Sequence, residues 1–335
     1  HHYGAIPVNR LLRYSLLLTL LAPIAVLPAA ERTPVLSQIK VPHDYYFREM
    51  YLPQLTSGPS ALAWMPGGDA LVYSMQGSLW LQRLDSTVAR QLTAGPGYDF
   101  QPDVAADGNT VVFARYSGDA LELYLLDIAS GEVRPLTSGG DVNLEPRFAP
   151  DGKRLAWVST KTNGRFHVYV GSLTEQGLES APLLPERVSR TPRYYYGEVD
   201  HELSPSWSPD GKHLLYVGNP ETIYGSGAIW RRALDGGDAL PVRLEETTWR
   251  ARPDWSPDGK RVIYSSYLGR QWHQLWLTTA AGGGDPLPLS YGDYDITAAR
   301  WSPDGKRIAY IANEHGGLEI RVQEVLGGKV TPLHI

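Results

Sequence analysis

The side chains best suited to chemistry form short clusters that combine aromatic, arginine and acidic residues. The members that we single out as a candidate binding surface are Tyr194, Tyr195, Asp200, His201, Glu202, Trp249, Arg250, Arg252, Tyr267, Arg270, Trp272 and His273. Tyr, Trp and Arg are the residue types that most often anchor recognition, and arginine adds charge-assisted hydrogen bonds to carboxylates. These clusters favour binding of a protein or peptide, with acidic or C-terminal segments as suitable ligands. The alternative is that they belong to ordinary solvated loops.

The same sequence offers little for catalysis or for metal binding. It contains no cysteine, which excludes thiol catalysis and cysteine metal sites. Asp200, His201 and Glu202 are metal-capable, but neighbouring residues of a strand point to opposite sides and cannot all converge. The sequence lacks H-E-x-x-H and phosphate-loop motifs, and Gly225-Ser226-Gly227 lacks the spacing of a nucleophile elbow. We therefore expect no catalytic residue, no bound metal and no cofactor.

A repeated phrase organises the chain around these clusters. Trp-Ser-Pro-Asp-Gly occurs at 207–211, 255–259 and 301–305, and degenerate copies extend the series back to Phe148, Val104 and Trp64. The six anchors are separated by 40, 44, 59, 48 and 46 residues, a period typical of four-stranded β-propeller blades. The long third interval indicates an insertion at 182–202, which is where Tyr194 to Glu202 lie.

Each unit has the sequence pattern of four strands. An apolar stretch ends in the aromatic anchor, and Ser-Pro-Asp-Gly then favours a tight turn. Strand-forming runs follow, such as those at 307–312, 261–266 and 154–159, and a Leu-Thr-like segment closes the unit. The pattern predicts an all-β fold, a six-bladed β-propeller of four-stranded antiparallel blades over residues 51–335.

The phrase at 301–310, W-S-P-D-G-K-R-I-A-Y, resembles the propeller repeat of the TolB family and of non-catalytic propellers attached to exported bacterial hydrolases. The resemblance covers nearly all of residues 51–335 and implies cell-envelope partners. TolB-family proteins also carry an N-terminal α/β domain, for which residues 31–50 are too short. The motif predicts the fold more strongly than the function, because the same blades serve unrelated tasks.

Ring closure has two alternatives. Residues 54–58 resemble a fourth strand without its first three, and residues 330–333 supply another such strand at the far end. Either the N-terminal segment pairs with the last blade, or the C-terminal segment completes that blade alone.

Strand order also predicts which loops share a face. The Ser-Pro-Asp-Gly turns should lie on one face, called the turn face here. Loops between second and third strands and connections between blades should lie on the other, the loop face, where the candidate binding residues fall. Because variable loops on a rigid scaffold are frequent binding sites, we expect the partner there.

Two rows of residues should line the channel. Directly before the anchors stand Ala63, Asp103, Arg147, Ser206, Asp254 and Arg300, so that blades two and three, and five and six, offer opposite charges. Two positions earlier stand Ala61, Gln101, Glu145, Ser204, Arg252 and Ala298, a mixed polar ring. We interpret the charged row as structural pairs between blades.

The first thirty residues have the features of a secretory signal. Arg10 and Arg13 precede an apolar run at 16–27, and the small residues Ala29 and Ala30 follow. We expect removal of residues 1–30 as a signal peptide, a retained anchor being the alternative, followed by a linker at 31–50. The processed chain would have no membrane span, because the run is short and broken by proline.

Composition agrees with an exported globular protein. The formal net charge of −5 and the absence of a basic tract argue against nucleic acid and anionic lipid as partners. We therefore expect a periplasmic or secreted, non-catalytic propeller scaffold that binds a protein or peptide on its loop face. The alternative is the N-terminal propeller of a longer exported hydrolase of the amidohydrolase, metal-dependent phosphoesterase or prolyl oligopeptidase type, with the catalytic domain as its partner.

Overall fold

The computed structural model describes residues 58–162, 164, 166–175, 177–184, 201–218, 227–247, 251–326 and 328–335. The expected signal peptide at 1–30 and linker at 31–50 lie outside these residues, as does most of the insertion. Within the part of the chain that is described, no helix is long and apolar enough to span a membrane.

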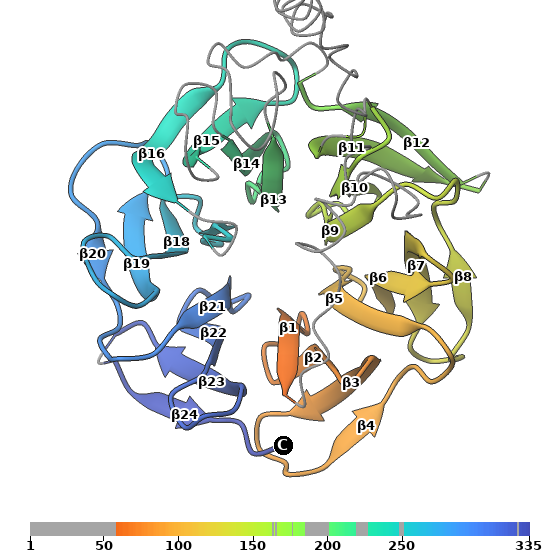
Figure 1. Ribbon diagram of the computed structural model, residues 1–335, viewed down its shortest axis with the longest axis horizontal. Coiled ribbons are helices and arrows are strands. Elements are labelled where there is room, and N and C mark those ends of the chain that lie inside the picture. The colour runs from red at the N-terminus through yellow and green to blue at the C-terminus, as the bar shows by residue number, and fades with distance from the viewer. Residues whose placement is uncertain are drawn as a thin grey trace, which may run out of the picture. The chain divides into compact units, whose positions relative to one another are not determined.

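Six antiparallel sheets of four strands form the ring in Figure 1, and each sheet is one blade. The strands of blades one to three are β1 (Pro59–Trp64), β2 (Ala70–Met75), β3 (Ser78–Arg83), β4 (Ala89–Gln91), β5 (Tyr98–Val104), β6 (Thr110–Ser117), β7 (Ala120–Asp127), β8 (Val133–Pro135), β9 (Asn143–Phe148), β10 (Arg154–Ser159), β11 (His167–Thr174) and β12 (Gly177–Pro182). The strands of blades four to six are β13 (Glu202–Trp207), β14 (His213–Gly218), β15 (Gly227–Ala233), β16 (Leu240–Thr247), β17 (Asp254–Trp255), β18 (Arg261–Ser266), β19 (Gln274–Thr279), β20 (Leu287–Pro288), β21 (Ile296–Trp301), β22 (Arg307–Ala312), β23 (Glu319–Glu324) and β24 (Val330–Pro332). The six-bladed all-β prediction is confirmed.

The aromatic anchors end the innermost strands and are buried, as the repeat predicts. Trp207 Nε1 donates to the carbonyl of Arg147 in the preceding blade at 3.0 Å. The guanidinium of Arg154, also in that blade, lies over the Trp207 ring, 4.9 Å from its centre. Trp207 therefore joins two blades by packing, a hydrogen bond and a cation–π contact.

The repeated turns have their polar groups occupied internally. In blade five, Ser256 Oγ donates to Asp258 Oδ1 at 2.5 Å and accepts from the backbone N–H of Arg261 at 2.9 Å. Gly259 has φ of 73°, a conformation that glycine adopts without steric cost. The Ser and Asp side chains of the phrase thus form their hydrogen bonds within the turn and stabilise it.

Blade six is completed by the C-terminal strand β24, which pairs with β23. The alternative closing segment, residues 54–57, lies outside the described residues. Blades six and one lie side by side in Figure 1. Trp64 Nε1 donates to the carbonyl of Arg300 at 3.0 Å, and Arg307 Nη2 donates to that of Gly68 at 2.6 Å. Apolar side chains of both blades form one cluster across this junction, including Leu62 and Ile311.

Candidate functional site

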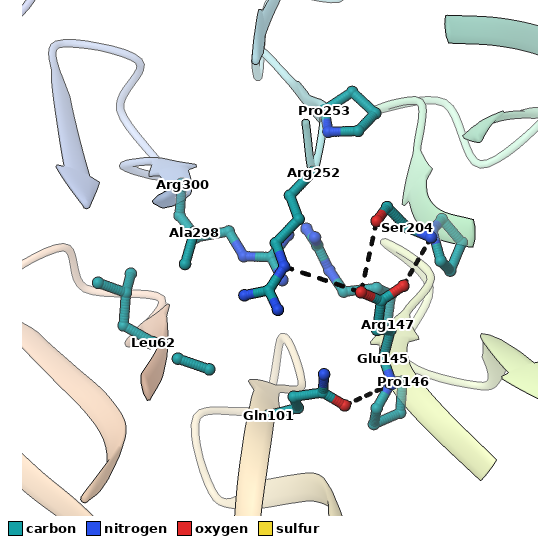
Figure 2. Close-up of a pocket in the computed structure, with 12 residues that line it drawn as sticks. Leu62, Gln101, Glu145, Pro146, Arg147, Ser204, Arg252, Pro253, Ala298 and Arg300 are labelled. Carbon is teal, nitrogen blue, oxygen red and sulfur yellow. Dashed lines mark hydrogen bonds and ion pairs between the residues drawn. The ribbon is translucent and has the colours of Figure 1, made fainter. Parts of the chain in front are cut away.

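The channel is lined by innermost strands that share an unusual backbone conformation. Five non-glycine residues, each three positions before an anchor, have φ between 36° and 55°: Gln101, Glu145, Ser204, Arg252 and Ala298. The pairing register shifts here in β5, β9, β13 and β21, which indicates β-bulges. A bulge redirects a side chain, and these bulges place their side chains at the channel (Figure 2).

The side chains at these bulges form a first layer of hydrogen bonds between neighbouring blades, which we call the upper layer. Gln101 Oε1 accepts from the backbone N–H of Glu145 at 2.9 Å, and Glu145 Oε2 accepts from that of Ser204 at 2.6 Å. Glu145 Oε1 then lies 3.8 Å from Arg252 Nε. On the remaining side of the ring, Ala61 and Ala298 offer no polar side chain, so this layer is polar on one side only.

A second layer, which we call the lower layer, is formed by the residues directly before the anchors, two positions further along each strand. Asp103 accepts from the N–H of Phe148 at 2.7 Å, and Asp254 accepts from that of Trp301 at 2.8 Å. Ion pairs join Asp103 to Arg147 at 3.4 Å and Asp254 to Arg300 at 3.3 Å. Both predicted pairs between neighbouring blades are thus confirmed, and the structure adds a third between Arg147 and Asp254 at 2.8 Å, from blade three to blade five.

Burial governs the ionisation of this lower layer. Desolvation raises the pKa values of Asp103 and Asp254, although the charge of Arg147 acts in the opposite direction. Desolvation alone would lower the pKa of Arg147, but the charges of Asp254 and Asp103 outweigh it and the pKa is raised. Arg147 therefore remains a cation held between two carboxyl groups.

The two layers surround a narrow opening in the channel, called the channel pocket here. It is lined by Ala61, Leu62, Gln101, Glu145, Pro146, Arg147, Ser204, Pro205, Arg252, Pro253, Ala298 and Arg300. Its open volume of about 30 Å³ can hold a water molecule or two rather than a whole organic ligand. Such a pocket can accept one small polar group from a larger molecule.

Of the candidates before blade four, His201 and Glu202 are described and both are buried. Glu202 is fully buried, and its Oε2 accepts from the N–H of Val168 at 3.0 Å. His201 packs against the ring of Phe166, with 5.9 Å between ring centres. These contacts attach the start of β13 to blade three, and they leave neither side chain on the surface.

The candidates of blade five form a second group on the loop between β18 and β19. Tyr267 is 42% exposed and contacts buried His273, with the two rings tilted by 41° and their centres 3.7 Å apart. Arg270 lies over the rings of Trp276 and Tyr291, at 4.7 and 4.6 Å from their centres. Trp272 is half-buried. We call Tyr267, Arg270 and Tyr291 the blade-five patch.

The remaining sequence candidates are not brought together by the described structure. Tyr194, Tyr195, Asp200, Trp249 and Arg250 lie outside the described residues. Arg252 lies in the channel pocket, and no hydrogen bond, ion pair or ring contact joins it to the blade-five patch within the described residues. Among the described candidates, Arg252 thus lies in the channel pocket and Tyr267 and Arg270 in the blade-five patch, and a single binding surface stays a prediction.

The sequence predicted a polar ring at the channel, but Arg252 is the only member of that ring among the candidate binding residues. Gln101, Glu145 and Ser204 also line the channel pocket. A signal was present, because proline follows each of these residues and Arg252 in the sequence. Proline within a sheet is confined to edges and bulges, so its recurrence two positions before an anchor indicates the bulge that exposes the preceding side chain.

Among the described residues, one cluster has metal-capable geometry. The ligand atoms of Glu314, His315 and Glu319 lie within 4.8 Å of one another, and two of the three residues are exposed. Arg321 forms ion pairs with both carboxylates, at 2.5 Å to Glu314 and closer to Glu319. A bound cation would have to compete with this guanidinium.

Part of the chain is similar in sequence to known β-propeller proteins. Residues 52–181 match the family described as the TolB beta propeller domain. The Tol-Pal system protein TolB of Francisella tularensis subsp. mediasiatica is 23% identical over 158 residues, which cover 37% of this chain and 36% of that protein. The chain is a TolB-like propeller.

Solved structures agree on the fold of this TolB-like propeller. TolB from Acinetobacter baumannii has a TM-score of 0.61 at 18% identity, covering 85% of this chain and 68% of that chain. The tricorn protease also has a TM-score of 0.61, at 17% identity, and the match covers 84% of this chain but 26% of the protease. The chain thus spans about a third of the curated relative above, and the same fold occurs inside a much larger peptidase.

Proposed function

We propose that this TolB-like propeller is an exported, non-catalytic scaffold that binds a protein or peptide partner on its loop face. The observation that carries the proposal is the difference between its two faces. On the turn face, Ser and Asp side chains bond to their own turns. On the loop face, the blade-five patch leaves Tyr267 and Tyr291 42% and 68% exposed beside an arginine.

Exposed aromatic and arginine side chains on a rigid support are the usual anchors of a protein interface. Arg270 is already ordered, because Nη1 donates to the carbonyl of Ser290 at 3.2 Å and the side chain stacks on two rings. An ordered anchor loses little conformational entropy when a partner binds. The patch therefore supports recognition, and the name of the matched relative, a Tol-Pal system protein, makes cell-envelope proteins the first partners to examine.

The test compares matched variants in partner capture from a cell-envelope extract. Arg270→Ala removes one positive charge from the loop face, and Lys260→Ala removes one from an exposed position on the turn face. We expect Arg270→Ala to weaken retention of the captured partner by about tenfold or more, and Lys260→Ala to leave it unchanged. The reverse pattern would show that the partner occupies the turn face.

A second candidate function follows from the tricorn comparison, in which this fold is one part of a peptidase chain. The scaffold would then hold a catalytic domain encoded beside it. Sequencing the gene beyond the codon for Ile335 tests this alternative: a hydrolase domain in the same reading frame favours it, and a stop codon favours the free scaffold.

A further inference from the structure

Arg252 occupies the channel pocket without the partners that its neighbours have. The side chain extends across the channel in Figure 2, and it is 29% exposed. Among the described residues it forms one ion pair, which joins Nε to Glu145 Oε1 at 3.8 Å, beyond hydrogen-bonding distance. Nε is itself buried and has no hydrogen-bond acceptor among the described residues. A guanidinium has five N–H donors, so Arg252 retains unused donor capacity.

The surrounding acceptors are engaged elsewhere. Glu145 accepts from the backbone N–H of Ser204, and Asp254 accepts from Arg147 and from the backbone N–H of Trp301. On the other side of the channel, Ala61 and Ala298 provide no acceptor side chain. Because an unsatisfied buried donor costs free energy, the arrangement favours an acceptor from outside the described residues.

The charge and size of the channel pocket define that acceptor. The charged residues that line the pocket are three arginines and one glutamate. Arg147 and Arg300 form ion pairs with Asp103 and Asp254, so Arg252, at 3.8 Å from Glu145, is the arginine with the least compensated charge. The open volume of about 30 Å³ suits a group the size of a carboxylate better than a bulkier phosphate ester. A planar guanidinium also matches the two oxygens of a carboxylate.

We propose that Arg252 binds a carboxylate of a partner segment that enters the channel pocket from the loop face. The carboxylate comes from an Asp or Glu side chain or from a C-terminus. This inference rests on the proposed function, since it specifies the chemistry of the partner. It adds a second anchor, distinct from the blade-five patch.

The test uses the full chain and an array of immobilised ten-residue peptides of random sequence. One half of the array carries a free α-carboxylate and the other half a C-terminal amide. We expect the wild-type chain to retain acidic peptides in both halves if a side chain supplies the carboxylate, or free-acid peptides alone if the C-terminus supplies it. Retention with no preference for a carboxylate, or no retention at all, would overturn the inference.

The decisive variant is Arg252→Gln. Glutamine occupies the equivalent position of blade two with a similar φ, 52° for Gln101 and 36° for Arg252, so the variant should fold with an unchanged melting temperature. We expect this variant to bind the selected peptides with an affinity about tenfold to a hundredfold lower than that of wild type, as for loss of a charge-assisted hydrogen bond. The matched control is Arg134→Gln on the outer strand β8, where the arginine is exposed.

The outcomes separate the two proposals. If Arg252→Gln binds the selected peptides as well as wild type does, the carboxylate anchor is wrong, whatever the envelope capture shows. If the peptides bind through Arg252 while capture from the extract never depends on the loop face, the anchor stands and the proposed function fails.

Discussion

At the scale of single residues, the repeated phrase acts through its hydrogen bonds. Asp258 accepts from Ser256 Oγ at 2.5 Å and from the backbone N–H of Lys260 at 3.0 Å. These bonds, with the nearby charge of Arg261, lower the pKa of Asp258, because they favour the ionised form. The equivalent aspartates at 210 and 304 have the same contacts and the same direction of shift. The sequence predicted these turns, since Ser, Pro, Asp and Gly each have a known role in them.

This shift predicts how acid affects the turn. The pKa of Asp258 is lower in the folded state than its unfolded value of about 3.9, so the ionised carboxylate stabilises the fold at pH values above the unfolded pKa. This contribution is lost as the pH falls through the folded pKa. Asp258→Asn should therefore lower the melting temperature at pH 7, with a gap from wild type that narrows below about pH 4. Thermal melts from pH 7 to pH 2.5 measure the gap. Asp238→Asn changes an exposed aspartate in the connection between β15 and β16, and this control should show no such pattern.

At the scale of elements, the innermost strands show where sequence reasoning stops. Alternation and turn signals identified these strands, and opposite charges at Asp103 and Arg147 correctly predicted their pairing. The bulges were not predicted, because the residue types at Glu145 and Arg252 do not indicate a positive φ. Only the proline after it gave a signal. The ion pair between Arg147 and Asp254 depends on the curvature of the ring, which sequence spacing does not contain.

The bulge in β21 predicts different costs for glycine at adjacent alanines. Ala298 has φ of 55°, which favours glycine, whereas Ala299 is buried in the same bulge without a positive φ. Ala299→Gly should lower the free energy of unfolding by about 1 kcal/mol. Ala298→Gly should cost less, because relief of about 1 kcal/mol of backbone strain offsets the lost methyl group. Urea unfolding of both variants measures the difference. Equal losses would show that the bulge carries no strain.

At the scale of the whole molecule, six sequence repeats produce a ring whose two faces differ. The repeated phrase predicted the blade number and the stereotyped turn face, because every copy has the same local chemistry. The site was predicted only in part. Tyr267 is exposed and Arg270 half-buried, so both stay candidates for binding, whereas His201 and Glu202 are buried by packing against blade three. That packing joins residues distant in sequence, so local patterns could not reveal it.

The most direct test of loop-face binding is hydrogen exchange of the full chain, alone and saturated with the partner that it captures. The account predicts slower exchange at residues 267–273 and 291–295 and in the strand segments that line the channel pocket, with no change in the turns at 208–211, 256–259 and 302–305. Bound partner should exclude water from the first set and leave the second exposed. Protection confined to the three turns would contradict the account.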